Sequence, residues 1–183
     1  MFLGELADQL LGLARGGAVA DRDQLHAKLA ATGLDQHLIH RTAPEATLAQ
    51  LMLAHTHEHV HAVEEAALEL AQRYETEEQQ YLPLDPDTTL NPHSWQAATA
   101  AADAVIAAVD AVMQGEIDHA FCAIRPPGHH ACRAQAMGFC FINNVAVAAK
   151  YALQRHGLKR VAIVDFDVHH GNGTEDIVAS DPR

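Results

Sequence analysis

The sequence is poor in several features that define whole classes of protein. It has three cysteines among 183 residues, and none of them forms a Cys-x-x-Cys pair. This argues against a disulfide framework and indicates a reducing compartment. Basic residues are also scarce, because 12 Lys and Arg stand against 24 Asp and Glu and give a net charge of −12. Phosphate backbones repel so acidic a chain, so direct binding to nucleic acid is not expected.

Long apolar runs are missing as well. No continuous apolar segment reaches the roughly 20 residues that a transmembrane helix needs, so no membrane association is expected. The first residues place Leu3, Leu6, Leu10 and Leu13 at helical spacing, but acidic residues interrupt them. This pattern predicts an amphipathic helix rather than a signal peptide. We therefore expect a cytoplasmic protein.

Helix-forming sequence and histidine are abundant. The length suits one domain or part of a larger one. Residues 1–115 are predicted to be mainly helical, apart from a proline-rich loop at 82–93. An Ala-rich helix follows that loop, with Ser94 as its cap and Gly115 at its end.

The pattern changes in residues 116–183. Residues 119–125 and 160–168 have the apolar, β-branched character of short buried strands, and 143–156 has that of a helix. A strand, a helical crossover and a second strand predict two parallel strands joined with right-handed geometry. Ligands in open parallel sheets sit beyond the carboxyl ends of the strands. Both predicted strands run directly into histidine-rich segments.

The end of the second predicted strand carries Asp165, Asp167 and His169, which share one face because strand side chains alternate. Asp167 and His169 can bind one divalent ion from the same side, and a carboxylate with an imidazole suits zinc. Asp165 lies one pleat deeper, behind the ligands. The alternative is that the carboxylates cap the next helix and the histidines are solvated. Burying two unpaired acids at the end of an apolar strand would be costly, which favours a site.

The end of the first predicted strand carries His129 and His130 after a Pro-Pro-Gly turn. Adjacent histidines can supply general acid–base chemistry near neutral pH. Each needs a partner that fixes its tautomer, and Asp165 and Asn172 are the candidates. The alternative is a surface loop with two ordinary histidines, which the neighbouring Asp-x-His strand end disfavours.

Three segments together resemble one known family. They are RPPGHHA at 125–131, GFCFINNVAVAA at 138–149 and VDFDVHHGNGT at 164–174. Their order and spacing are similar to those of the histone deacetylase superfamily, specifically its class II-like bacterial members and the acetylpolyamine amidohydrolases. The resemblance implies the arginase–deacetylase α/β fold, a parallel sheet between helical layers. It also implies zinc-dependent removal of an acyl group from an amine.

The resemblance also implies roles for individual residues. Asp167 and His169 match zinc ligands of the family. His130 is similar to the histidine assigned as general base and then general acid. His129, paired with Asp165, is similar to its electrostatic partner.

Further positions follow from the same resemblance. Asn172 stands where class II-like members carry Asn. Gly138, Phe139 and Cys140 match the motif whose Phe lines the acyl channel. Asp87 lies in the loop that touches the substrate backbone in the family. A structural potassium ion is implied at the strand end that carries the zinc ligands.

The chain also departs from the family pattern. The family has a third zinc ligand, an Asp, well downstream of the Asp-x-His strand, and an oxyanion-stabilising Tyr further still. Neither is found here, and an opening strand and HPE-type motif are also not found. We therefore expect residues 1–183 to be a single incomplete deacetylase domain, cut at both ends and with impaired activity.

Alternatives remain open at this point. The substrate can be an acetylated lysine side chain or an acetylated polyamine, and a second copy of the chain can be a partner. A binuclear arginase-like site would need an acid where Gly171 stands. A further hypothesis, from a different functional class, is a non-catalytic fragment that acts through a partner. A metal site at His55, His57, His59 and His61 is disfavoured, because these histidines fall on two faces of a helix.

Overall fold

The computed structural model describes residues 20–74 and 81–183. The chain divides into two compact units, Met1–Thr42 and Ala43–Arg183. Within the first unit, α2 (Ala20–Thr32) is followed by a 3-10 turn, η1 (Leu34–His37). Gly33 separates them with a left-handed φ of 73°. The amphipathic helix expected at the N-terminus lies outside the described residues.

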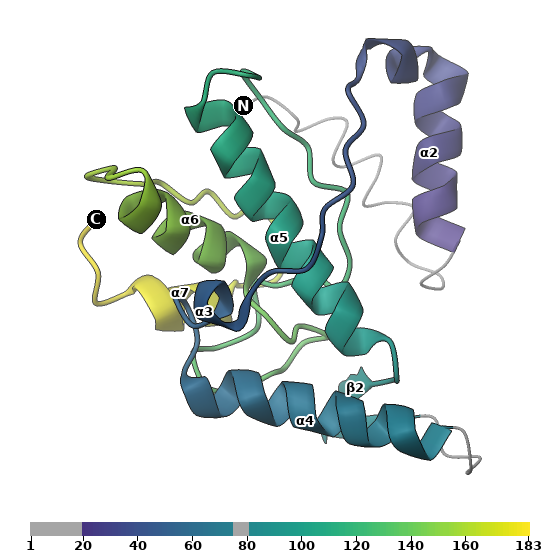
Figure 1. Cartoon of the computed structure of the whole chain (residues 1–183), viewed down its shortest axis with the longest axis vertical. Coiled ribbons are helices and arrows are strands. Elements are labelled where there is room, and N and C mark those ends of the chain that lie inside the picture. Colours follow the sequence, from purple (N-terminus) through teal and green to yellow (C-terminus); the bar gives the residue numbers. More distant parts are fainter. Residues whose placement is uncertain (1–19, 75–80) are drawn as a thin grey trace. The chain divides into compact units, whose positions relative to one another are not determined.

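The second unit contains the remaining elements, most of which Figure 1 labels. They are α3 (Leu48–Leu51), α4 (His57–Tyr74), β1 (Leu82–Asp85), β2 (Thr88–Leu90), α5 (Ser94–Met113), α6 (Asn144–Arg155) and α7 (Asn172–Val178).

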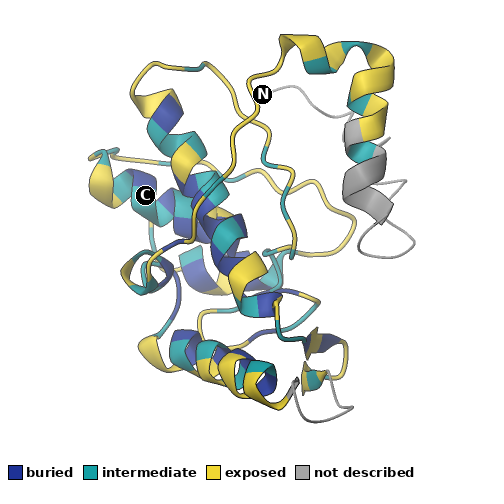
Figure 2. Ribbon diagram, turned by 45° about the vertical axis from the view of Figure 1, so that its right-hand side comes forward, coloured by how far each residue is buried: buried dark blue, intermediate teal, exposed yellow. Residues whose placement is uncertain are grey.

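Helix α5 forms one side of the packed interior. Helix α5 is long and apolar enough to cross a membrane, but the core helix of a water-soluble protein passes the same test of length and composition. Ala98, Ala102 and Ile106 are almost fully buried, and buried positions recur along the helix beside exposed ones (Figure 2). Its Asp110 accepts hydrogen bonds from Tyr151 and His156, which lie at the end of α6. These contacts favour a core helix packed against α6.

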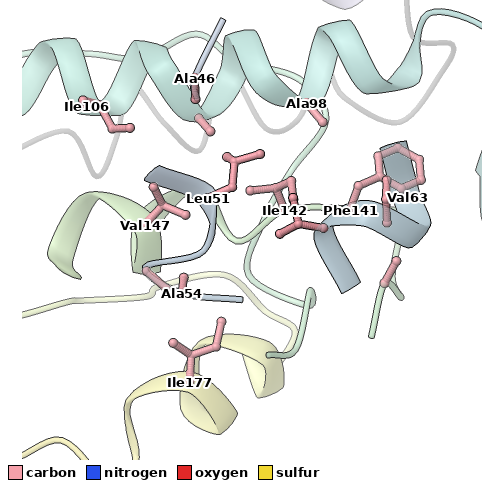
Figure 3. Close-up of a cluster of buried hydrophobic side chains, with 14 of the residues drawn as sticks. Ala46, Leu51, Ala54, Val63, Ala98, Ile106, Phe141, Ile142, Val147 and Ile177 are labelled. Carbon is pink, nitrogen blue, oxygen red and sulfur yellow. The ribbon is translucent and has the colours of Figure 1, made fainter. Parts of the chain in front are cut away.

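The hydrophobic core lies directly under the segment that precedes α6. Leu51, Ile106, Ile142, Val147 and Ile177 come from five different parts of the chain and meet in one buried cluster (Figure 3). Burying these side chains stabilises the fold by about 1.5–3 kcal/mol for each large aliphatic group. The loop between the tandem histidines and α6 is therefore anchored in the core.

The two helices predicted on either side of this core are confirmed. The predicted 143–156 helix is α6, and the Asn143 side chain caps it by accepting from Ala146 N. The Ala-rich helix is α5, with His93 as its N-cap in place of the expected Ser94. Ser94 instead accepts from Asn91 N, which stabilises the turn before the helix.

The prediction of parallel strands at 119–125 and 160–168 is wrong for this structure. In the described parts of the chain neither segment pairs with a strand, and the sheet consists of β1 and β2 alone. Parallel strands take their hydrogen bonds from neighbours and are normally buried on both faces. Val164, Phe166 and Val168 are 73%, 63% and 90% exposed, so the segment has an apolar strand sequence without the cover that a strand needs.

The expected loop at 82–93 contains a short hairpin. Strands β1 and β2 pair antiparallel, with Leu82 opposite Leu90. The fully buried Leu90 and Thr88 fix the register, because both point to the covered face. Of the prolines and acids that predicted a loop, Pro86 and Asp87 form the turn, whereas Pro83 and Asp85 lie in β1.

Candidate active site

The tandem histidines each have one side-chain partner from the distant 165–172 segment. His129 Nδ1 donates to Asp165 Oδ2 at 2.9 Å, and His130 Nδ1 donates to Asn172 Oδ1 at 2.7 Å. The two imidazole rings are 4.0 Å apart between centroids. These are the partners that the sequence indicated for the two histidines.

The chemistry of the partners fixes which ring nitrogen carries the proton. A carboxylate oxygen accepts hydrogen bonds, so His129 Nδ1 is the donor in its pair. The Asn172 amide nitrogen faces the sulfur atoms of Cys132 and Met137 at 3.6 and 3.4 Å, which turns its Oδ1 toward His130. The Nδ1 atom of His130 therefore donates as well, and Nε2 is the nitrogen that can accept a proton.

Two glycines let the polypeptide approach these rings closely. A Cβ atom at Gly138 would lie 2.5 Å from the His130 ring, and the backbone there has a φ of 58°. A Cβ atom at Gly171 would lie 2.3 Å from Asp165 Oδ2 and 3.4 Å from His129 Nδ1. Side chains at these positions would displace the histidine pairs, so both pairs depend on glycine.

Asp167 and His169 lie together at the end of the extended segment 160–168. The Oδ1 atom of Asp167 is 3.0 Å from His169 Nδ1 and accepts from His169 N at 2.7 Å. The backbone hydrogen bond from His169 is the main reason that the pKa of Asp167 is lowered. Asp165 Oδ1 likewise accepts from Asp167 N at 3.1 Å. The His169 ring lies 6.1 Å from that of His130, at an angle of 70°.

The donor chemistry at Asp167 and His169 fits zinc in kind but supplies only part of a site. A carboxylate oxygen and an imidazole nitrogen are both zinc ligands, and here they already lie side by side. Across residues 20–74 and 81–183, no group of three or more His, Cys, Asp or Glu side chains is placed to hold a metal. Catalytic zinc usually has three protein ligands. The described residues therefore provide two.

The residues that match the acyl channel pack beside His130. Phe139 has a left-handed φ of 63° and is 63% exposed, which places its ring at the surface of the site. Cys140 is fully buried, and its Sγ donates to Gly138 O at 3.2 Å. Burial raises the pKa of the Cys140 thiol to about 11, so the group stays protonated and is not a nucleophile.

Asp87 lies beside the channel motif. Its Oδ1 accepts from Gly138 N at 3.1 Å and from Thr88 Oγ1 at 2.9 Å, and its contact with the substrate backbone stays a prediction. Thr88 Oγ1 in turn accepts from Phe139 N at 3.0 Å. The hairpin thus holds the backbone of the channel motif, a role for Thr88 that the sequence did not reveal.

The histidines of the 55–61 segment separate into two pairs. His55 and His59 are buried, whereas His57 and His61 form a second pair with ring centroids 4.1 Å apart. The four histidines therefore form two separate pairs, in agreement with their predicted position on two faces of a helix.

The sequence of this chain is similar to those of known proteins. A family model described as a histone deacetylase domain matches residues 19–183. The histone deacetylase-like amidohydrolase of Pseudomonas aeruginosa is 53% identical over 94 residues, which cover 51% of this chain and 25% of that protein. Polyamine deacetylase HDAC10 of Homo sapiens is 41% identical over 156 residues, which cover 85% of this chain and 23% of that protein. The chain spans about a quarter of the length of these relatives.

A solved structure supports the same relationship. The crystal structure of the HDA15 HD domain matches with a TM-score of 0.72 and 40% sequence identity, over 82% of this chain and 40% of that one. The matches place the chain in the arginase–deacetylase α/β fold that the sequence predicted. The paired histidines and the Asp167–His169 turn all fall inside the matched range of the family model. The chain belongs to the histone deacetylase family.

Proposed function

We propose that this protein is a zinc-dependent amidohydrolase that removes an acetyl group from an amine. The observation that carries the proposal is the pair of differently partnered histidines. His129 is held by a carboxylate and its neighbour His130 by a neutral amide. One imidazole therefore has a charge-assisted hydrogen bond, and the other has a neutral partner that leaves its Nε2 as the acceptor for proton transfer.

The chain's own residues divide the proton chemistry as follows. His130 takes a proton from the attacking water at Nε2 and later gives it to the leaving amine. Asn172 keeps the His130 ring in the tautomer that this transfer requires. Asp165 holds the His129 ring, which stabilises negative charge that develops beside it. The close contact of the two rings lets both histidines act on the same reacting group.

Asp167 and His169 would hold the zinc ion. When bound, zinc polarises the amide carbonyl and can lower the pKa of water from about 15.7 to near 7. A structural potassium ion at the same segment remains a prediction, as do a cytoplasmic location and association of two copies.

The substrate class follows from charge and shape. An acidic protein with a net charge of −12 attracts cationic molecules, and both lysine-rich tails and polyamines are cationic. The exposed Phe139 ring offers an apolar surface for the methylene chain that precedes the acetylated nitrogen. An acetylated polyamine is a specific candidate beside acetyl-lysine, because a relative named as a polyamine deacetylase matches 85% of the chain.

A zinc titration of the 183-residue chain against a competing chelator tests the metal assignment. The wild type is expected to bind one zinc ion weakly, and Asp167→Asn and His169→Ala are each expected to weaken binding at least about tenfold. His170→Ala is the matched control, because His170 is an adjacent exposed histidine that contacts Glu175. The reference chain and all variants carry His57→Ala, which removes one half of the surface pair with His61. Unchanged affinity in His169→Ala would overturn the assignment.

An assay with an acetyl-lysine peptide and a monoacetylated polyamine tests the reaction. Little turnover is expected from the 183 residues, since two protein ligands are fewer than the usual three. A missing oxyanion donor would lower transition-state stabilisation by a further amount of about 2.7–4 kcal/mol. Whatever turnover is measured should vanish in His130→Ala while zinc stays bound. Turnover that survives this substitution would refute the role of His130.

A further inference from the structure

A buried histidine lies beneath the tandem-histidine turn and is not part of the catalytic assignment. His55 is 3% exposed and belongs to the turn between α3 and α4. Its Nδ1 lies 3.0 Å from Cys132 O, and its Nε2 lies 2.8 Å from Asn143 N. One imidazole ring therefore bridges the chain just after His130 and the residue that caps α6.

The two partners allow one protonation state of this ring. A carbonyl oxygen accepts hydrogen bonds, so Nδ1 of His55 must carry hydrogen. A backbone N–H donates, so Nε2 must be unprotonated. Protonation would set two donors against each other at Asn143. Burial and the neighbouring His59 lower the pKa of His55 to about 4, in agreement with a neutral ring.

Asn143 extends the bridge to the histidines themselves. Its Nδ2 donates to Ala131 O and to Thr174 Oγ1, each at 3.1 Å. Thr174 N then donates to His129 O at 3.1 Å. Asn143 is fully buried and Thr174 is 7% exposed, so water does not compete for these bonds. The hydrogen bonds that start at His55 thus reach the backbone at His129 and at the residues just after His130.

Backbone contacts also engage ring nitrogens that a metal ion at His55 and His59 would need. Both nitrogens of His55 are engaged by backbone groups, and His59 Nε2 donates to Phe141 O at 2.9 Å. The imidazoles of both residues therefore bind the backbone of the 132–143 segment. The metal-like spacing of His55 and His59 on the sequence reflects this shared anchoring.

We propose that His55 is a positioning residue that, as a neutral imidazole bridging Cys132 and Asn143, fixes the turn carrying His129 and His130. The proposal deepens the proposed deacetylase function, on which its catalytic meaning rests. The bridge itself involves neither Asp167 nor His169, so it exists without zinc.

Nitrogen NMR of the histidine rings in the 183-residue chain tests the proposal at pH 7. The wild-type His55 is expected to show a protonated Nδ1 and an unprotonated Nε2. His55→Leu removes both hydrogen bonds and should shift the ring signals of His129 and His130 and the amide signal of Thr174. His55→Gln offers one donor and one acceptor on the same side chain, so it should restore most of these signals.

Leu70→Ala is the matched control, because Leu70 is buried in the same core on α4 but makes no polar link to the turn. It should lower stability without moving the His129 and His130 signals. Equal shifts in Leu70→Ala, or unchanged signals in His55→Leu, would overturn the proposal. If His55→Leu does not fold, the wild-type tautomer and the comparison of His55→Gln with Leu70→Ala still decide. If the chain does not bind zinc but His55→Leu still shifts the His129 and His130 signals, the result counts against the proposed function and not against the role of His55.

Discussion

The tandem-histidine turn and the extended segment 160–168 both bring candidate site residues together, but the chain supports them differently. The turn is tied to the core by buried hydrogen bonds from His55, Asn143 and Thr174. In the extended segment, Asp165 and Asp167 accept local hydrogen bonds from the backbone N–H two residues later, and Asp165 also accepts one from His129. Its Val164, Phe166 and Val168 side chains are exposed. One half of the site is therefore anchored by buried tertiary contacts, and the other mainly by short-range turns at the surface.

This difference indicates which half of the site is preorganised within the chain. Buried, fully paired polar networks define one arrangement, because breaking any member leaves a costly unpaired group. Local turns at the surface define their residues less firmly, since water can replace their hydrogen bonds. We expect substitutions in the two regions to have effects of very different size.

The largest effect is expected for Asn143→Ala. The change removes the cap of α6 and leaves Ala131 O without its buried donor, so the free energy of unfolding should fall by about 3 kcal/mol. Urea unfolding measures it. Asn91→Ala is the control, because its side chain accepts one local bond from His93 N, and its loss should be below about 1 kcal/mol. Similar losses at both positions would remove the contrast between the regions.

Acid should weaken the anchored half through His55. Its pKa is about 4 in the folded chain, against 6.5 as the ordinary value. Burial and then the neighbouring His59 lower this pKa most, the charge of Arg133 lowers it least, and backbone hydrogen bonds to Cys132 and Arg133 raise it in part. Between these values the unfolded chain binds more protons, so stability is complete above pH 6.5 and is lost as the pH falls toward 4. The loss is about 3 kcal/mol at the full shift.

Unfolding curves of wild type and His55→Gln across this pH range isolate that contribution. The difference between the two proteins should shrink as the pH falls from 6.5 to 4. A constant difference would show that His55 does not titrate in this way.

A smaller effect is expected for Gly138→Ala. The new Cβ would meet the His130 ring at a residue with positive φ, so unfolding should become easier by about 2–3 kcal/mol and the ring should move. Gly157→Ala is the control, since Gly157 has a φ of 67° but nothing within 4 Å of the added atom. Its loss should be about 1 kcal/mol, from the backbone alone. Equal losses would mean that the close approach to His130 is unimportant.

The smallest effect is expected for Val168→Ala in the extended segment. The Val168 side chain is 90% exposed, so the free energy of unfolding should change by less than about 0.5 kcal/mol. The same urea measurements test this. A loss above about 1 kcal/mol would show that the segment packs in solution.

The sequence predicted those parts of the molecule whose signals are local. The apolar periodic run at 143–156 predicted α6 correctly, and the structure shows that Asn143 caps it. The order of the motifs indicated the partners of His129 and His130, because acids and amides near a strand end are few. The strands were mispredicted, because an apolar β-branched run shows only that a segment can be a strand. Whether it becomes one depends on neighbouring strands.

The supporting network could not be predicted in the same way. His55 bonds to backbone groups 77 and 88 positions away, and such contacts leave no periodic pattern in the sequence. Its i, i+4 spacing with His59 indicated a helix face or a metal site, which are both local interpretations. Only the fold shows that the ring contacts the turn.

Hydrogen–deuterium exchange of the metal-free chain, followed by peptide, tests most directly whether the tandem-histidine turn is anchored independently of the extended segment. The amides of Ala131, Asn143, Ala146, Val147 and Thr174 each donate a hydrogen bond and should exchange at least about a hundredfold more slowly than those in 162–166, for which the described structure shows no backbone hydrogen bond. Equal, rapid exchange in both regions would contradict the claim that the chain itself organises the histidine half of the site.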